Sequence, residues 1–154
     1  MNDSNCPLCQ KIAACHAGSF PLLVHEFAHS YLILGDHQFY PGYSVLVLKP
    51  HARELHELDP LIQKGLMAEL MLAGAAIGKS YSPVKMNYAS YGNQVEHVHW
   101  HIIPRYAHDP NLKDEPFSNA KEFSKYQTQV DEAQKDIRLI SKTLHAIQSN
   151  PDNF

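Results

Sequence analysis

Histidine and large apolar residues alternate along residues 97–103, and this is the most regular pattern in the chain. The odd positions hold the histidines and the even positions hold the apolar residues: His97, His99 and His101 against Val98, Trp100 and Ile102. Successive side chains of a β-strand point to opposite faces, so the alternation predicts a strand with its apolar face in a core. β-Branched and aromatic residues favour a strand over a helix, on which the histidines would spread around the axis. We therefore expect three imidazoles on one face of a strand that ends at Pro104.

Other apolar runs predict the rest of the fold. Four are bounded by turn residues or charges and predict strands at 21–26, 30–35, 44–49 and 84–90. Helical spacing of apolar residues predicts helices at 6–15, 58–79 and 129–147. The polar stretch 108–119 contains two prolines and is expected to be a surface loop. This order of elements predicts an α+β fold with a mainly antiparallel sheet.

Composition narrows the class of protein. The 154 residues fit a single domain spanning 1–154, and the net charge of −3 argues against a large nucleic-acid footprint. No apolar run reaches membrane-spanning length, and the polar N-terminus lacks the apolar core of a signal peptide. We expect a cytoplasmic protein that binds neither membranes nor nucleic acids. An odd number of cysteines, namely Cys6, Cys9 and Cys15, argues against a disulfide framework.

The histidine motif and its surroundings resemble the histidine triad (HIT) superfamily of nucleotide hydrolases and transferases. The family signature is His-φ-His-φ-His-φ-φ with φ apolar, and residues 97–103 fit every position. The Pro41-Gly42 turn, the apolar strand leading to His51, and the residues Asn87, Gly92 and Arg105 also match. The resemblance covers about residues 6–105. It implies a HIT-like domain with a five-stranded sheet, one long helix and one or two shorter helices, followed by a C-terminal extension that carries the helix at about 129–147.

The resemblance also implies a reaction. The protein would cleave a phosphoanhydride or phosphoramidate bond at the α-phosphate of a nucleotide, with a diadenosine polyphosphate or an adenosine phosphoramidate as substrate. His99 would attack the phosphorus and form a nucleotidyl-histidine, a role that suits an imidazole because its neutral form is available near neutral pH. The backbone carbonyl of His97 would accept the proton on the other nitrogen of that ring, and His101 would stabilise charge on the phosphate. Substrate contacts are expected from Asn87, Asn93 and Gln94, with a solvated turn as the alternative for the last two.

Cys6-Pro7-Leu8-Cys9 is the second candidate constellation. Taken alone, such a pair is compatible with a redox pair, two buried thiols or half of a zinc site. The resemblance implies a zinc site completed by His51 and His97. Four protein ligands leave no open position, so this zinc would be structural. Cys15 has no partner in this scheme and is expected in the core.

Two positions depart from the family pattern. Many relatives have a histidine after the Pro-Gly turn, where this chain has Tyr43. Relatives also hold the ribose hydroxyls with an acidic or amide residue eight positions earlier, where this chain has Gly35. The neighbouring Asp36 is our candidate to replace that contact.

Two other functions are compatible with the same residues. The three histidines can instead ligate a catalytic zinc with an open position, which would make the protein a metal-dependent hydrolase. The departures at Gly35 and Tyr43 also allow a non-catalytic nucleotide-binding protein. The family implies a homodimer, and we expect no organic cofactor. Four residues are candidates either for an apolar base pocket or for ordinary core: Leu8, Ile12, Phe27 and Leu34. The remaining histidines fit no motif and are expected at the surface: His16, His25, His29, His37, His56, His108 and His145.

Overall fold

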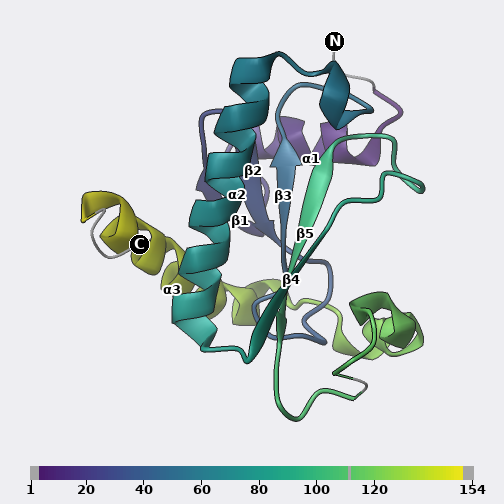
Figure 1. The fold of residues 1–154 in the computed structure, drawn as a ribbon, viewed down its shortest axis with the longest axis vertical. Coiled ribbons are helices and arrows are strands. Elements are labelled where there is room, and N and C mark those ends of the chain that lie inside the picture. Colours follow the sequence, from purple (N-terminus) through teal and green to yellow (C-terminus); the bar gives the residue numbers. More distant parts are fainter. Residues whose placement is uncertain (1–3, 111, 151–154) are drawn as a thin grey trace.

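The structure is a computed structural model that describes residues 4–110 and 112–150. Its strands are β1 (Leu23–Glu26), β2 (Ser30–Leu34), β3 (Ser44–Leu48), β4 (Lys85–Ala89) and β5 (His99–Arg105). Its α-helices are α1 (Pro7–His16), α2 (Pro60–Tyr81) and α3 (Val130–Ser149). Two 3-10 segments, η1 (Leu55–Glu57) and η2 (Pro116–Tyr126), complete the described elements (Figure 1). The helix expected at 129–147 is thus α3, and with 20 residues it is nearly as long as the 22-residue α2.

The strands form one antiparallel sheet in the order β1-β2-β3-β5-β4. This confirms the predicted α+β fold with a five-stranded sheet. β5 lies between β3 and β4, and its register places His99 opposite Val47 and His101 opposite Val45. The histidine strand is therefore an inner strand, with ladder bonds on both sides to hold its direction.

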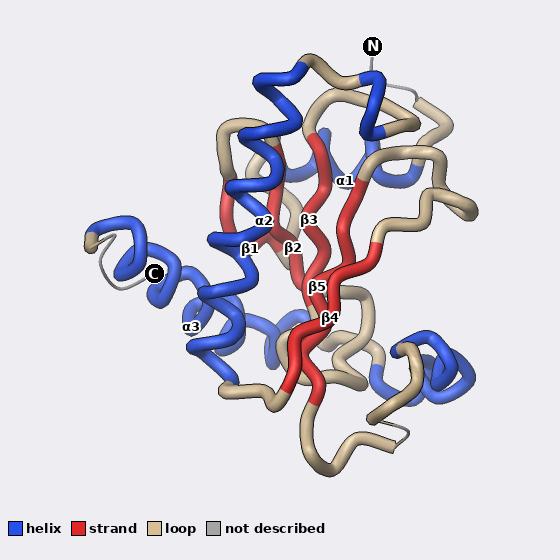
Figure 2. The backbone as a smooth tube through the Cα atoms, in the orientation of Figure 1, coloured by secondary structure: helices blue, strands red, loops and turns tan. Residues whose placement is uncertain are grey.

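Two apolar clusters cover the two faces of the sheet. The face that carries Leu46 and Ile102 packs against α2 and α3, and Val98 joins the same cluster. The opposite face carries Val45 and Val47 and packs against α1. Figure 2 shows the strands between these layers, with α2 in front and α1 behind. Because every residue of β2 and β3 is buried, these strands lack the polar alternation of a solvent-facing sheet.

α2 combines a well-defined start with one close contact to the sheet. The Asp59 side chain accepts a hydrogen bond from the backbone N–H of Leu61 at 2.8 Å, and Pro60 occupies the first turn. A Cβ atom at Gly74 would lie 2.2 Å from the Tyr88 hydroxyl, so glycine is what allows Tyr88 of β4 to approach the helix. By length and composition α2 is also apolar enough to cross a membrane. Its Leu66, Leu70 and Ile77 are buried against the rest of the protein, however, as in the core helix of a globular fold.

The boundaries of β5 differ from the prediction at both ends. The strand starts at His99, after a bend at His97, and it runs through Pro104 to Arg105. Pairing with β3 stops at Ile102, whereas pairing with β4 continues to Arg105. The carbonyl of Arg105 accepts from Val84 on the β4 side at 2.9 Å, so the missing N–H of Pro104 faces the side where no strand remains. The proline therefore costs no ladder bond and does not end the strand.

Candidate functional site

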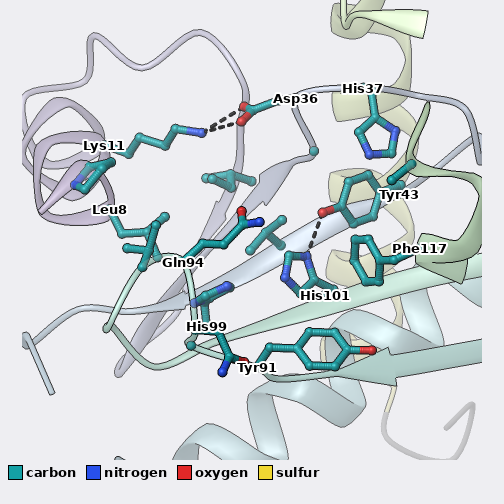
Figure 3. Close-up of a pocket in the computed structure, with 18 of the residues that line it drawn as sticks. Leu8, Lys11, Asp36, His37, Tyr43, Tyr91, Gln94, His99, His101 and Phe117 are labelled. Atoms are coloured by element: carbon teal, nitrogen blue, oxygen red, sulfur yellow. Dashed lines mark hydrogen bonds and ion pairs between the residues drawn. The ribbon is translucent and has the colours of Figure 1, made fainter. Parts of the chain in front are cut away.

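A cavity of about 920 Å³ opens on the α1 side of the sheet, above β3 and β5. Segments far apart in sequence line it: α1, the turn after β2, the loop before β5, β5 itself and η2. Figure 3 shows His99 and His101 projecting into the space between these segments. The imidazoles of His99 and His101 therefore lie in the cavity between α1 and η2.

The His99 ring has a defined tautomer. Its Nδ1 lies 2.6 Å from the backbone oxygen of His97. A carbonyl oxygen can only accept, so Nδ1 of His99 carries the proton and Nε2 keeps its lone pair. Among the described residues, none is hydrogen-bonded to that Nε2, and the ring lines the cavity. The arrangement leaves an unprotonated imidazole nitrogen available to a ligand.

His101 lies beside His99, with ring centroids 4.9 Å apart. Its Nδ1 is 2.6 Å from the Tyr43 hydroxyl, a contact drawn as a dashed line in Figure 3. Burial lowers the pKa of His101 to about 4, with smaller contributions from His99 and His37. His101 is therefore neutral near pH 7.

The third histidine of the motif faces a different site. His97 is fully buried and does not line the cavity. Its Nε2 donates to the backbone oxygen of Leu48 at 2.7 Å, so its Nδ1 carries a lone pair. The strand starts at His99, so His97 lies just before it, and its ring joins Cys6, Cys9 and His51, the residues with which the resemblance grouped it. His97 acts on the cavity indirectly, because its backbone oxygen accepts the hydrogen bond that orients His99.

Nδ1 of His97 points into a cluster with Cys6, Cys9 and His51, whose ligand atoms all lie within 4.8 Å of one another. The distance between the His51 and His97 Nδ1 atoms is 3.3 Å, and Sγ of Cys9 lies 3.4 and 3.6 Å from these two nitrogens. Sγ of Cys6 lies 3.6 Å from Nδ1 of His97. Tetrahedral zinc, with bonds of about 2.0 Å to nitrogen and about 2.3 Å to sulfur, keeps its ligand atoms roughly 3.3–3.8 Å apart.

The donor set also suits zinc chemically. All three cysteines are free thiols and buried. Burial lowers the pKa of His97, which keeps that imidazole in the neutral form that a metal requires. The bond from His97 to Leu48 fixes the ring from outside, as the outer partners of metal-bound histidines do. The cluster is therefore compatible with zinc.

Three of the four predicted substrate-binding residues line the cavity, and the fourth does not. Asn93 and Gln94 line the cavity from the loop before β5. Asp36 also lines it, but its carboxylate is ion-paired with Lys11 at 2.8 Å (Figure 3). Asn87 lies outside the cavity, where its side-chain oxygen accepts from Arg105 at 3.2 Å.

The family model described as "HIT domain" matches residues 21–108. The chain belongs to the HIT family. Its relatives include adenosine 5'-monophosphoramidase of Saccharomyces cerevisiae, 29% identical over 104 residues that make up 67% of this chain and 64% of the yeast protein. A Bacillus subtilis protein named "Protein hit" is 29% identical over 108 residues, 66% of this chain and 72% of that protein. The chain thus spans slightly less than two thirds of the yeast relative's length.

Solved HIT structures share the fold. A HIT protein from Sinorhizobium meliloti superposes with a TM-score of 0.70 at 25% identity, covering 79% of this chain and 88% of that one. A zinc-bound HIT family protein from Mycobacterium smegmatis gives 0.68 at 20% identity, with coverages of 94% and 96%. Plasmodium falciparum diadenosine triphosphate hydrolase gives 0.58 at 19% identity, with coverages of 84% and 78%. Two of these relatives, one from yeast and one from Plasmodium, are hydrolases of nucleotide compounds by name.

Part of the cavity wall comes from beyond the matched HIT residues. Phe117 of η2 packs on the His101 ring with centroids 5.1 Å apart, and on Tyr91 at 5.7 Å. The expectation of a plain surface loop at 108–119 was therefore wrong for its second half. The Tyr40 hydroxyl donates to the backbone oxygen of Pro116 at 3.0 Å, and this buried bond holds the segment in place.

Sequence reasoning also missed His37, which we expected at the surface. It lines the cavity and stacks on Tyr43 and Phe123 at 4.7 and 3.9 Å. Of the four apolar candidates, Leu8 and Leu34 line the cavity, whereas Ile12 and Phe27 are core. The high aromatic content around residues 37–43 was a visible signal, but nothing in the sequence tied it to residues 117–123.

Proposed function

We propose that this HIT protein is a nucleotide hydrolase in which His99 attacks the α-phosphorus of a nucleotide. The observation that carries the proposal is the 2.6 Å hydrogen bond from Nδ1 of His99 to the His97 carbonyl. Because Nδ1 holds the proton, Nε2 has a free lone pair, and the ring lines the cavity. An imidazole held in this tautomer is a nucleophile that needs no base to remove a proton. The neighbouring His101 adds a second nitrogen at the same side of the cavity.

The proposed reaction has two displacement steps. In the first, the bond from Nε2 of His99 to phosphorus forms and the bond to the leaving group breaks, so the nucleotidyl-histidine carries a positive ring. The bond from Nδ1 to the His97 carbonyl becomes charge-assisted at that moment and favours the intermediate. In the second, water attacks phosphorus, the P–N bond breaks, and the nucleoside monophosphate leaves. In the first step the leaving group departs as an oxyanion, or as an amine that takes its proton from solvent. In the second step the proton that water loses passes to solvent, and the electron pair of the P–N bond returns to Nε2 of His99.

We propose a diadenosine polyphosphate or an adenosine phosphoramidate as substrate. The names of the yeast and Plasmodium relatives support these two classes. Asn93 and Gln94 are the proposed contacts to the phosphate and leaving group, because they line the cavity from the loop that precedes the histidine strand. Asp36 is the proposed contact to the sugar, with Lys11 as its present partner.

Covalent trapping tests the mechanism. The protein is incubated with dinucleotide labelled at the α-phosphate, denatured in alkali and analysed for protein-bound label. We expect label on His99, and we expect His99→Ala to lose both label and turnover by about 10⁴-fold or more. His56→Ala, which removes an exposed histidine, is the matched control and keeps both. Full activity of His99→Ala would contradict the mechanism.

We propose that the Cys6, Cys9, His51 and His97 cluster binds a structural zinc ion. Distances of 3.3 to 3.6 Å between four pairs of its ligand atoms support this assignment, because they lie in the range that tetrahedral zinc requires. Zinc bound there would fasten α1 to the end of β3 and to the start of β5. The alternative, a hydrolase with a three-histidine catalytic zinc, is disfavoured because the His97 ring lies in the cluster with Cys6, Cys9 and His51, whereas His99 and His101 line the cavity.

The second alternative is a nucleotide-binding protein without catalysis. Calorimetry with adenosine monophosphate, combined with turnover assays on dinucleotides and phosphoramidates, separates it from the enzyme. Tight binding with no turnover of any of these compounds would favour the binding protein. The free Nε2 of His99 favours the enzyme.

We further propose a cytoplasmic homodimer that uses no organic cofactor. Apolar residues of α2 and β4 remain at the surface of the single chain and support an interface there: Leu61, Met67, Met71 and Tyr88. Sedimentation equilibrium measures the dimer directly. A monomer at all concentrations would rule it out.

A further inference from the structure

The hydroxyl of Tyr43 is hydrogen-bonded to Nδ1 of His101 and so decides which nitrogen of that ring carries the proton. The residue is 5% exposed, and its hydroxyl has no hydrogen-bond partner among the described residues other than Nδ1 of His101 at 2.6 Å. Burial raises the pKa of Tyr43 above its ordinary range, so the phenol keeps its proton. A buried O–H with a single neighbour donates to that neighbour. Nδ1 of His101 is therefore the acceptor.

The proton of a neutral His101 must then sit on Nε2. No described residue is hydrogen-bonded to this nitrogen, and the ring lines the cavity. His101 thus offers an N–H donor to a ligand, whereas the neighbouring His99 offers a lone pair. The two adjacent rings are therefore opposite tautomers. The His97 carbonyl accepts from Nδ1 of His99, and the Tyr43 hydroxyl donates to Nδ1 of His101.

Gly35 is what makes room for the Tyr43 ring. A Cβ atom at position 35 would lie 2.2 and 2.3 Å from two carbons of that ring, closer than side chains can approach. Residue 35 therefore cannot carry any side chain while Tyr43 is in this place. Glycine at 35 and tyrosine at 43, the two departures from the family pattern, therefore depend on each other. The Tyr43 ring occupies the space that a side chain at position 35 would need.

A stack of rings supports this unit from the C-terminal segment. His37 stacks on Tyr43 at 4.7 Å with an interplanar angle of 29°, and Phe123 stacks on His37 at 3.9 Å with 21°. The hydroxyl of Thr128 donates to the backbone oxygen of Gly35 at 2.6 Å. The chain after the matched HIT residues therefore packs against the far side of the ring that holds His101.

We propose that Tyr43 is a positioning residue that fixes His101 as a neutral Nε2–H donor to the substrate, and that Gly35 is required because it leaves space for the phenol ring. His101 then stabilises the charge that develops on phosphate or leaving group through a hydrogen bond, with no proton leaving its ring. The chemical use of this donor rests on the proposed nucleotide hydrolysis, but the tautomer and its dependence on Tyr43 do not.

The test is the variant Tyr43→Phe, which keeps the stacked ring and removes only the O–H. Long-range ¹H–¹⁵N spectra of the imidazoles of the full chain report which nitrogen of His101 is protonated, without any turnover. In the unmodified protein we expect protonated Nε2 and unprotonated Nδ1. In Tyr43→Phe we expect this pattern to be lost, with kcat about 10- to 100-fold lower and KM less changed.

Two further variants separate positioning from a general structural effect. Tyr81→Phe removes another phenol O–H, bonded to Asp136 at 2.6 Å away from the cavity, and should leave the His101 signals unchanged. Gly35→Ala should disturb the His101 signals in the same way as Tyr43→Phe, because it displaces the ring. In the double variant the two effects on kcat should not add, since both remove the same hydrogen bond.

The outcomes distinguish this inference from the proposed function. A proton on Nδ1 of His101 in the unmodified protein, or an unchanged His101 pattern in Tyr43→Phe, overturns the role of Tyr43 even if the protein hydrolyses nucleotides. Absence of turnover with the expected spectra would overturn the hydrolase instead and leave the tautomer assignment in place.

Discussion

At the residue scale, a short list of backbone and side-chain partners decides what each histidine does. Three imidazoles follow one another at every second position, yet their partners differ: a cluster of thiols for His97, a carbonyl for His99 and a phenol for His101. The same side chain is therefore a candidate ligand, a candidate nucleophile and a candidate donor within five residues. Residue type alone does not carry these roles.

Arg105 gives a prediction at this scale. Its side chain is 1% exposed and its Nε lies 3.0 Å from the carboxylate of Asp109, which is 5% exposed. Replacing the arginine in Arg105→Met leaves that carboxylate buried without its partner. We expect the free energy of unfolding, measured by urea denaturation, to fall by about 3–5 kcal/mol.

The exposed pair of Lys11 and Asp36 is the matched control for this measurement. Its carboxylate is 69% exposed, so water replaces the lost partner. Lys11→Met should cost less than about 1 kcal/mol. Equal losses in the two variants would show that Arg105 is not a structural ion pair.

At the element scale, local patterns could be predicted and long-range packing could not. The alternation in β5 and the apolar spacing along α2 are set by neighbouring residues, so the sequence was enough to find both elements. Asn87 was expected at the substrate, but Arg105, 18 positions away in the chain, holds its side chain. The residues of η2 reach the cavity through contacts such as the Tyr40–Pro116 bond, which joins positions 76 apart. No period or motif reports contacts of that kind.

η2 supplies the prediction at this scale. Phe117 lines the cavity beside His101, so Phe117→Ala removes an aromatic wall against a bound ligand. An aromatic contact is worth about 0.5–1.5 kcal/mol, which corresponds to a rise in KM of up to about tenfold. Steady-state kinetics on a hydrolysed dinucleotide measures it, with a smaller effect expected on kcat. Leu112→Ala removes an exposed apolar side chain that does not line the cavity and should leave KM unchanged. A KM for Phe117→Ala equal to that of Leu112→Ala would place η2 outside the binding site.

At the scale of the whole molecule, the cysteine–histidine cluster joins elements that are distant in the chain. Cys6 and Cys9 belong to the start of α1, His51 follows β3, and His97 precedes β5. The resemblance to the HIT family predicted these four residues together, whereas the Cys-x-x-Cys pair alone left three interpretations open. The cluster lies next to the His97 carbonyl that holds His99, so a metal there would stabilise the fold and the active strand through the same residue.

Removal of zinc is the prediction that follows. Zinc at a free concentration of about a thousand times its Kd stabilises the folded state by about 4 kcal/mol. For a chain of this size, we therefore expect a chelator that removes the ion to lower Tm by roughly 10 °C. Cys6→Ser should lower Tm similarly and make it insensitive to chelator. Cys15→Ala is the control: burial raises the pKa of the Cys15 thiol to about 11, and this residue lies outside the cluster, so its variant should remain chelator-sensitive. Because a structural ion acts on folding, turnover per folded molecule measured well below Tm should persist after chelation. Reversible loss of turnover at an unchanged Tm would instead identify a catalytic metal and refute the structural assignment.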